Sequence, residues 1–246
     1  MPRERLDLAM LRLGLVPSRE QAKRLILAGE VRIGDRRITQ PGWEVREGEQ
    51  IILRQPPKFV SRGGLKLEGA LEAFQIDVTG FTALDVGAST GGFTDCLLQR
   101  GAKKVFAFDV GTNQLVWKLR SDPRVISREK TNVRHLQPAD VGEEVDILVA
   151  DVSFISLTLV LPAALSVLRP GGQAVVLVKP QFELSREEVG KGGIVREPAL
   201  HQKACDKIET FVRSIPELEW RGIVESSLQG TDGNREYLAW FQKKID

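Results

Sequence analysis

From residue 80 onward the chain alternates short apolar runs with segments of helical spacing. The clearest runs are rich in valine, leucine, isoleucine and phenylalanine, and they lie at 81–87, 104–110, 145–152 and 173–180. Each predicts a strand that is buried on both faces, and a weaker strand is predicted at 124–127. The segments between them include a predicted helix that follows the first strand and ends at Gly101. Strands that alternate with helices predict an α/β fold, a mostly parallel sheet with helices on both faces.

The C-terminal part of the chain extends this pattern. Residues 157–172 predict a helix and its stop, in the "RPGG" that precedes the fifth strand. Two further strands are predicted at 221–228 and 235–242, joined as an antiparallel hairpin across "QGTDGN". The predicted sheet therefore has seven strands.

A glycine-rich turn follows the first of these strands, in "LDVGASTGGF". Glycine lets the backbone approach a ligand closely, and the helix N-terminus that follows can receive an anion or a polar group. The spacing of Gly87, Gly91 and Gly92 is not G-x-G-x-x-G, which makes a dinucleotide-dependent dehydrogenase the weaker interpretation. Asp109 closes the second strand, where an acid takes ribose hydroxyls in such folds. We expect Asp85 to brace the loop rather than to touch a ligand.

Lys179 stands directly after the apolar run "VVLV", and Pro180 ends the strand. A charge at the end of a buried strand either caps a surface corner or faces a ligand, because open α/β sheets bind ligands beyond the carboxyl ends of their strands. Asp151 ends the preceding strand and should open at the same edge of the sheet.

The first fifty residues predict a small α+β module. Leu6, Ala9, Met10 and Leu13 form one helical stripe, and a second helix opens at Ser18 with a capping-box pattern and ends near Gly29. Short strands are predicted in "VRIG" and "QIIL". Residues 1–60 hold 12 basic against 8 acidic side chains, whereas the remainder holds 23 against 25. This excess indicates either a polyanionic partner or a solvated basic face without one.

Other features limit the classes of protein. Pro56-Pro57 favours a linker at 56–62, between domains at 1–55 and 63–246. The two cysteines, Cys96 and Cys205, give no disulfide framework, so a cytoplasmic location is expected. Neither they nor the two histidines have the neighbours of a metal site, and no metal is expected. No apolar run reaches the roughly 20 residues that cross a bilayer.

The N-terminal module resembles the RNA-binding domain first described in ribosomal protein S4. The residues that match its pattern are Arg19, Ala22, Leu25, Ile26, Gly29, Val31 and Ile33. The final turn reads Gly34-Asp35, which reverses the order of the pattern. The resemblance implies a set of phosphate contacts: Arg5, Arg19, Lys23, Arg24 and Arg32.

The larger domain resembles S-adenosylmethionine-dependent methyltransferases of the Rossmann-like fold. The resemblance implies that the glycine loop lies under the methionine and ribose of the cofactor. It also implies that Asp109 binds the ribose and that Asn132 contacts the adenine. The expected cofactor-binding residues are Gly87, Ala88, Ser89, Thr90, Gly91, Gly92, Phe93, Asp109 and Asn132.

Four motifs, "SRGGLKL", "DVSF", "VKPQFE" and "NREY", look like those of FtsJ-related ribose 2′-O-methyltransferases. Together with the N-terminal module, the chain is similar to the TlyA (haemolysin A) family of ribosomal RNA methyltransferases. The resemblance carries a catalytic tetrad onto Lys66, Asp151, Lys179 and Glu236. Glu183 is the competing acid, because it lies close to Lys179 in sequence and the assignment of Glu236 depends on the last hairpin.

The resemblance implies methyl transfer from S-adenosyl-L-methionine to a ribose 2′-hydroxyl of ribosomal RNA, at a cytidine. Ribosomal RNA or a ribosomal subunit is the expected partner, with no membrane and no stable protein partner. Lys179 acts as the base or as a cation that orients the hydroxyl; a free lysine has a pKa near 10.4, so a basic role needs that pKa lowered. The alternatives are a non-catalytic RNA-binding or ribosome-assembly factor and a membrane-lytic protein.

Overall fold

The computed structural model describes residues 3–53, 57–230 and 232–245. The chain divides into two compact units, Met1–Lys58 and Phe59–Asp246. The expected linker at 56–62 begins with Pro56, which lies outside the described residues. Phe59 is buried in the core of the second unit, whose first helix starts at Arg62.

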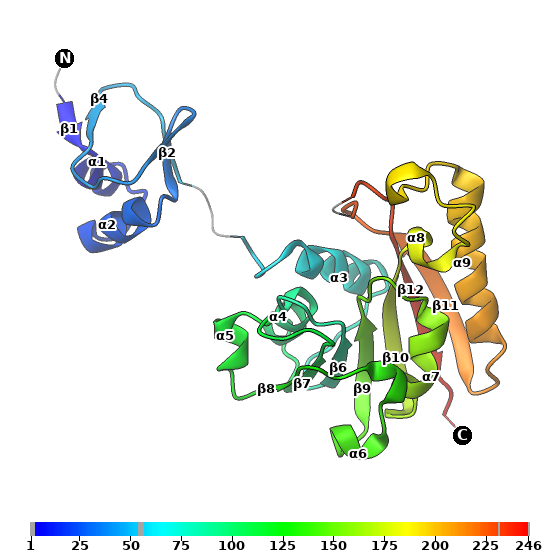
Figure 1. Cartoon of the computed structure of the whole chain (residues 1–246). Helices are drawn as coiled ribbons and strands as arrows, with labels where there is room; N and C mark the ends of the chain where they lie inside the picture. Colours follow the sequence, from blue (N-terminus) through cyan, green and yellow to red (C-terminus); the bar gives the residue numbers. More distant parts are fainter. Residues whose placement is uncertain (1–2, 54–56, 231, 246) are drawn as a thin grey trace. The chain divides into compact units, whose positions relative to one another are not determined.

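The first unit is a small α+β module (Figure 1). Its elements are β1 (Arg3–Arg5), α1 (Leu6–Arg12), α2 (Arg19–Leu27), β2 (Val31–Ile33), β3 (Arg36–Ile38), β4 (Glu44–Arg46) and β5 (Ile51–Leu53). Both predicted helices are confirmed, and the Ser18 hydroxyl accepts the backbone N–H of Gln21 at 3.2 Å, as the capping pattern predicts. Leu6, Met10 and Ile26 are fully buried in the core of this unit. Leu13 does not belong to the buried stripe as predicted, because α1 ends at Arg12 and the Leu13 side chain is exposed.

The second unit is built on one seven-stranded sheet in the order β11-β12-β10-β9-β6-β7-β8. The strands are β6 (Thr82–Val86), β7 (Lys104–Phe108), β8 (Val125–Arg128), β9 (Val145–Ala150), β10 (Leu168–Val178), β11 (Leu218–Glu225) and β12 (Tyr237–Lys243). From β10 to β8 neighbouring strands pair in parallel, whereas β12 is antiparallel to β10 and β11. The predicted fold class and the C-terminal hairpin are confirmed.

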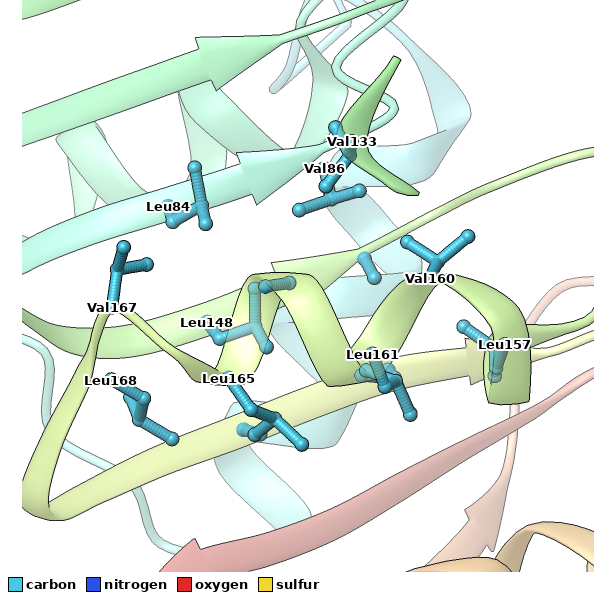
Figure 2. Close-up of a cluster of buried hydrophobic side chains, with 14 of the residues drawn as sticks. Leu84, Val86, Val133, Leu148, Leu157, Val160, Leu161, Leu165, Val167 and Leu168 are labelled. Carbon is cyan, nitrogen blue, oxygen red and sulfur yellow. The ribbon is translucent and has the colours of Figure 1, made fainter. Parts of the chain in front are cut away.

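Helices cover both faces of the sheet (Figure 1). The helices are α3 (Arg62–Ala73), α4 (Gly92–Gln99), α5 (Trp117–Arg120), α6 (Pro138–Val141), α7 (Leu157–Leu165), α8 (Pro180–Glu183) and α9 (Pro198–Arg213), with 3-10 turns η1 (Val133–His135) and η2 (Lys191–Gly193). Side chains of α3 and α4 join one core, and those of α7 and α9 join the other. Alternate residues of β6 serve the two cores, Ala83 on one face and Leu84 on the other. Figure 2 shows the second core, in which Leu84 and Leu148 of the sheet belong to the same cluster of buried side chains as Leu161 and Leu165 of α7.

Two segments differ from the prediction. Residues 168–172 belong to β10 instead of ending a helix, because α7 already ends at Leu165. The pairing of β10 with β9 is irregular between Leu168 and Gln173, where Pro170 has no N–H to donate. Helix α9 was not predicted; its buried residues include His201, Ala204 and Cys205, a weak apolar signal.

The strand order determines where the sheet can bind a ligand. The chain runs from β6 outward to β7 and β8, then crosses back to β9 on the other side of β6. Such a switch opens a crevice at the carboxyl ends of the strands, where open α/β sheets bind their ligands. Gly87 follows β6 and Asp151 follows β9, so these two residues flank the crevice.

Candidate active site

Asp151 and Lys179 meet at the carboxyl edge of the sheet. They follow the neighbouring parallel strands β9 and β10. The Lys179 Nζ lies 2.6 Å from Asp151 Oδ1 and donates to the Ser153 hydroxyl at 2.9 Å. The Lys179 side chain is only 12% exposed, so its charge is compensated by these partners instead of by bulk water.

Lys66 and Glu236 form a second ion pair, which is buried. Lys66 comes from α3 and Glu236 from the residue before β12, and their side chains are 10% and 3% exposed. The Lys66 Nζ donates to Glu236 Oε2. Removal of either partner would leave an uncompensated charge inside the unit, a cost of about 3–5 kcal/mol for such pairs.

All four members of the predicted tetrad line one cavity of about 440 Å³. The residues of the glycine loop that line the same cavity are Gly87, Ala88, Ser89, Thr90, Gly92 and Phe93. A second cavity of about 320 Å³ adjoins it, because both are lined by Gly87, Ser89 and Asp151. Asp109 and Asn132 line this second cavity. The volumes suit an elongated small molecule that lies along the glycine loop.

Gly87 lets two segments approach closely. Its φ of +82° is in the left-handed region, and a Cβ built there would lie 2.5 Å from the backbone oxygen of Asp151. Gly91 has φ +99° and lines neither cavity; a Cβ there would meet Leu119 and Leu115. Gly91 therefore shapes the turn into α4 instead of facing the cavities.

Asp109 braces the glycine loop through backbone hydrogen bonds. Its Oδ2 accepts the N–H of Ser89 at 2.8 Å, and its Oδ1 accepts that of Gly111 at 2.7 Å. Carboxylate oxygens carry further lone pairs, so the same group can still accept from ribose hydroxyls. Asn132 is exposed, and its side-chain oxygen accepts the N–H of Arg134 at the start of η1.

Asp85 lies beneath the loop and is fully buried. Its Oδ2 accepts from the Thr94 hydroxyl at 2.6 Å, and Oδ1 has no partner among the described residues. Burial raises the pKa of the Asp85 carboxyl from 3.8 to about 7, opposed by the Thr94 hydrogen bond and assisted by the charge of Asp151. Asp85 thus braces α4 against β6 instead of contacting the loop residues, and it lines neither cavity.

The pKa of Asp85 predicts a specific pH dependence of stability. A carboxyl whose pKa is raised by folding contributes fully below its unfolded pKa of about 3.8, and the contribution is lost as pH rises through about 7. Asp85→Asn keeps the acceptor for Thr94 but does not titrate. We expect the urea midpoint of the variant, relative to the unchanged protein, to rise from pH 4 to pH 7 and then level off. A difference that is constant with pH would contradict this prediction.

Glu183, the competing acid, lies elsewhere. Its carboxylate sits at the N-terminus of α7, where Oε1 accepts the N–H of Leu157 at 2.7 Å and Oε2 accepts from the Ser156 hydroxyl at 2.5 Å. Glu183 lines neither cavity, whereas Glu236 lines the first. The structure therefore brings Glu236, and not Glu183, to the other three charges.

The basic residues of the first unit fall into two groups. Arg5 and Arg19 are paired with the buried carboxylate of Asp7, at 3.0 and 2.9 Å. Hydrogen bonds from Arg5 and then Arg19, opposed by burial, lower the pKa of Asp7 to about 2. Lys23, Arg24 and Arg32 are exposed, and Arg32 donates to the backbone of Asp35. Arg5 and Arg19 therefore stabilise the module through Asp7, whereas the side chains of Lys23, Arg24 and Arg32 lie on its surface.

Sequence reasoning missed several residues of the site. Ser153 accepts a hydrogen bond from Lys179. It lies inside the "DVSF" motif, which was the available signal, but only Asp151 of that motif was predicted as a site residue. Ser61 and Arg62 line the first cavity at the start of α3. Asn234 is fully buried and ties the 189–197 loop to the last hairpin, because it accepts from the N–H of Val195 and donates to the oxygen of Gly193. The "NREY" motif was the available signal for Asn234.

Residues 3–53, 57–230 and 232–245 lack two features that would suggest other functions. Within them, no group of three or more histidine, cysteine, aspartate or glutamate side chains is arranged to hold a metal ion. Likewise, no helix formed by the described residues is long and apolar enough to cross a membrane.

Comparison with known proteins identifies both units. Residues 59–243 match the FtsJ-like methyltransferase family, and residues 4–51 match the S4 domain. The chain is 46% identical over 248 residues to the 16S/23S rRNA (cytidine-2′-O)-methyltransferase TlyA of Mycobacterium tuberculosis, covering 99% of the chain and 91% of the relative. It is 42% identical over 229 residues to Hemolysin A of Brachyspira hyodysenteriae, covering 93% and 95%. A solved structure from Streptococcus thermophilus, described as a hemolysin, is 47% identical with a TM-score of 0.74, covering 99% of this chain and 90% of that one.

Proposed function

The chain belongs to the TlyA family of FtsJ-like methyltransferases and uses S-adenosyl-L-methionine, and from this premise we propose that it methylates a ribose 2′-hydroxyl of ribosomal RNA, at a cytidine. The observation that carries the proposal is the convergence of Lys66, Asp151, Lys179 and Glu236 on one cavity beside the glycine loop. These residues come from four separate parts of the sequence. Because ribosomal RNA is the proposed substrate, we propose that the protein acts in the cytoplasm.

The two adjoining cavities fit the cofactor. At Gly87 the backbone can be approached closely, which suits the methionine end of the cofactor. The carboxylate of Asp109 lines the second cavity and suits the ribose end. When bound, S-adenosyl-L-methionine supplies a methyl group that its sulfonium already activates. The task left to the protein is to place the hydroxyl in line with that methyl, and placement of this kind is worth about 7–11 kcal/mol in well-oriented systems.

Lys179 is the residue we assign to the hydroxyl. An ammonium has three N–H donors. Here Lys179 donates one hydrogen bond, to the Ser153 hydroxyl, and its charge is paired with Asp151. Its remaining N–H groups can donate to the ribose oxygen, which supports the role of an orienting cation that stabilises negative charge as the methyl is transferred. We assign the hydroxyl proton to the carboxylate of Asp151, which lines the cavity and is paired with Lys179. The buried Lys66–Glu236 pair fixes the opposite wall of the cavity.

The proposed function is tested with the purified protein, methyl-labelled S-adenosyl-L-methionine and ribosomal subunits. Label should enter the RNA and not the ribosomal proteins. Absence of label from RNA of both subunits, with cofactor binding intact, would overturn the proposal and favour a non-catalytic RNA-binding factor.

We also propose that Lys23, Arg24 and Arg32 contact RNA phosphate. A triple alanine variant should bind a ribosomal RNA fragment more weakly, and the slope of log affinity against log salt should fall by about 2–3, because each lost phosphate contact removes about 0.7–0.9. Filter binding at several salt concentrations measures this. Cofactor affinity should not change, since these residues lie in the first unit.

A matched control removes three exposed cations from the second unit. Arg124, Lys203 and Arg213 are each paired with a carboxylate, Asp122, Glu188 and Glu209. Their triple alanine variant changes the net charge equally, and it should leave the salt slope within 0.5 of the unchanged protein's. Equal slopes for the two triple variants would contradict the proposed phosphate contacts.

A further inference from the structure

Two short loops carry the Asp151–Lys179 pair. One runs from Asp151 to Ser156 and joins β9 to α7. The other follows β10 and runs from Lys179 through the one-turn helix α8 to Glu183. Each loop is fixed at its start by a central strand. Their starts are joined to each other by the contact between Lys179 Nζ and Asp151 Oδ1.

The far ends of the same two loops are joined by Glu183. Its side chain is 1% exposed, and its two oxygens accept from the Ser156 hydroxyl and from the N–H of Leu157. Ser156 is the N-cap of α7 and Leu157 is its first residue. A buried carboxylate in this place is stabilised by the N-terminus of the helix, and it makes the position of one loop depend on the other.

Lys207 of α9 completes the connection. Its Nζ lies 3.0 Å from Glu183 Oε2 and donates to the backbone oxygen of Glu183 at 2.6 Å and to the Ser156 hydroxyl at 3.2 Å. This one ammonium therefore contacts both loops and neutralises the carboxylate between them. Its side chain is 40% exposed, so it is the accessible member of the cluster.

We propose that Glu183 and Lys207 are positioning residues for methyl transfer. They fix the segment that begins at Asp151 and the segment that begins at Lys179 relative to each other. The proposal rests on the proposed function of the cavity. The two segments contact each other at both ends. Asp151 and Lys179 form the contact at one end, and Glu183 with Ser156 and Lys207 forms the contact at the other. Loss of the Glu183 contacts lets Asp151 and Lys179 shift relative to each other. A misplacement of about 1 Å can lower a reaction rate about 100-fold.

The test compares single-turnover methylation of ribosomal RNA by Glu183→Gln, Lys207→Met and Lys207→Arg with that of the unchanged protein. Glu183→Gln should slow the methyl-transfer step by about tenfold or more, with the dissociation constant of S-adenosyl-L-methionine within about twofold. Lys207→Met should slow the same step less, and Lys207→Arg should restore the rate because it keeps a donor cation at the site. Should Glu183→Gln fail to fold, the two Lys207 variants still decide the matter.

Asp146→Asn is the matched control. Asp146 lies at the start of β9, the strand that Asp151 follows, and its carboxylate accepts the N–H of Thr82 and pairs with Arg169, each at 2.7 Å. This substitution removes a comparable junction between strands, so it should lower stability and leave the single-turnover rate unchanged. A folded Glu183→Gln with the rate of the unchanged protein, or equal slowing by Asp146→Asn, would overturn the proposal.

Crystals of Glu183→Gln separate this proposal from the proposed function. If Glu183 is a positioning residue, the distance from Lys179 Nζ to Asp151 Oδ1 in this variant should exceed the 2.6 Å of the unchanged protein. A longer separation would support the positioning role even if the unchanged protein methylated no RNA, in which case only the proposed function fails. An unchanged separation would refute the positioning role whatever the activity.

Discussion

Lys179→Met should lower the single-turnover rate of RNA methylation by about 1,000-fold and leave the affinity for S-adenosyl-L-methionine within about twofold. The ammonium of Lys179 is the group that the proposed mechanism places on the ribose oxygen, and methionine keeps the apolar stem while it removes every N–H donor. Asp151 and Ser153 would lose their partner, which adds a modest stability cost. Quench-flow with labelled cofactor measures the rate, and calorimetry measures the affinity.

Lys104→Met is the matched control for this variant. Lys104 begins β7 at the opposite edge of the same sheet, and it too is paired with a carboxylate, Glu143 at 2.6 Å. Its loss should leave both the rate and the affinity unchanged. If Lys179→Met retained the rate of the unchanged protein, Lys179 would have no part in the chemistry, and the whole assignment of the tetrad would have to be withdrawn.

Gly87→Ala should weaken binding of S-adenosyl-L-methionine by about 100-fold or more. A left-handed backbone costs a residue with a Cβ about 1–2 kcal/mol, and here the Cβ would also lie 2.5 Å from the backbone oxygen of Asp151. The two segments that flank the crevice must therefore move apart, and the floor of both cavities changes. Calorimetric titration with the cofactor measures the loss.

Gly80→Ala isolates the backbone cost from the clash. Gly80 has φ +76° just before β6, at the other end of the strand that Gly87 follows, but a Cβ there meets nothing within 4 Å. This variant should lose about 1–2 kcal/mol of stability and bind the cofactor normally. Equal cofactor affinity for Gly87→Ala and Gly80→Ala would show that the glycine loop is not the cofactor floor.

The fold was predictable from sequence where strands are long and buried. The run that ends at Lys179 and the run that ends at Asp151 both indicated central strands, and parallel strands bring their carboxyl ends to one edge. The three-residue strands β1, β3 and β4 were not predictable, because they consist mostly of arginine and glutamate and their pairing depends on the backbone. Helix α9 has helical spacing, but alanine, cysteine and histidine carry much of its buried face.

The site was predictable only as far as local sequence determines it. Residues at strand ends, such as Asp109, Asp151 and Lys179, follow from the topology of a parallel sheet. The choice between Glu183 and Glu236 does not, because it depends on how the last hairpin and helix α7 pack in three dimensions. The buried partner of Arg5 and Arg19 was also beyond reach, since a charge count records Asp7 without showing that it is buried between them.

If this cavity methylates a ribose oxygen, the new methyl group must be found on the ribose of the product RNA. RNA from ribosomal subunits methylated by the purified protein is digested to nucleosides and analysed by mass spectrometry with fragmentation. We predict 2′-O-methylcytidine, in which the added mass stays with the ribose, and its absence from the reaction of Lys179→Met. A methyl group on the base, or one that Lys179→Met adds as fast as the unchanged protein, would contradict the assignment.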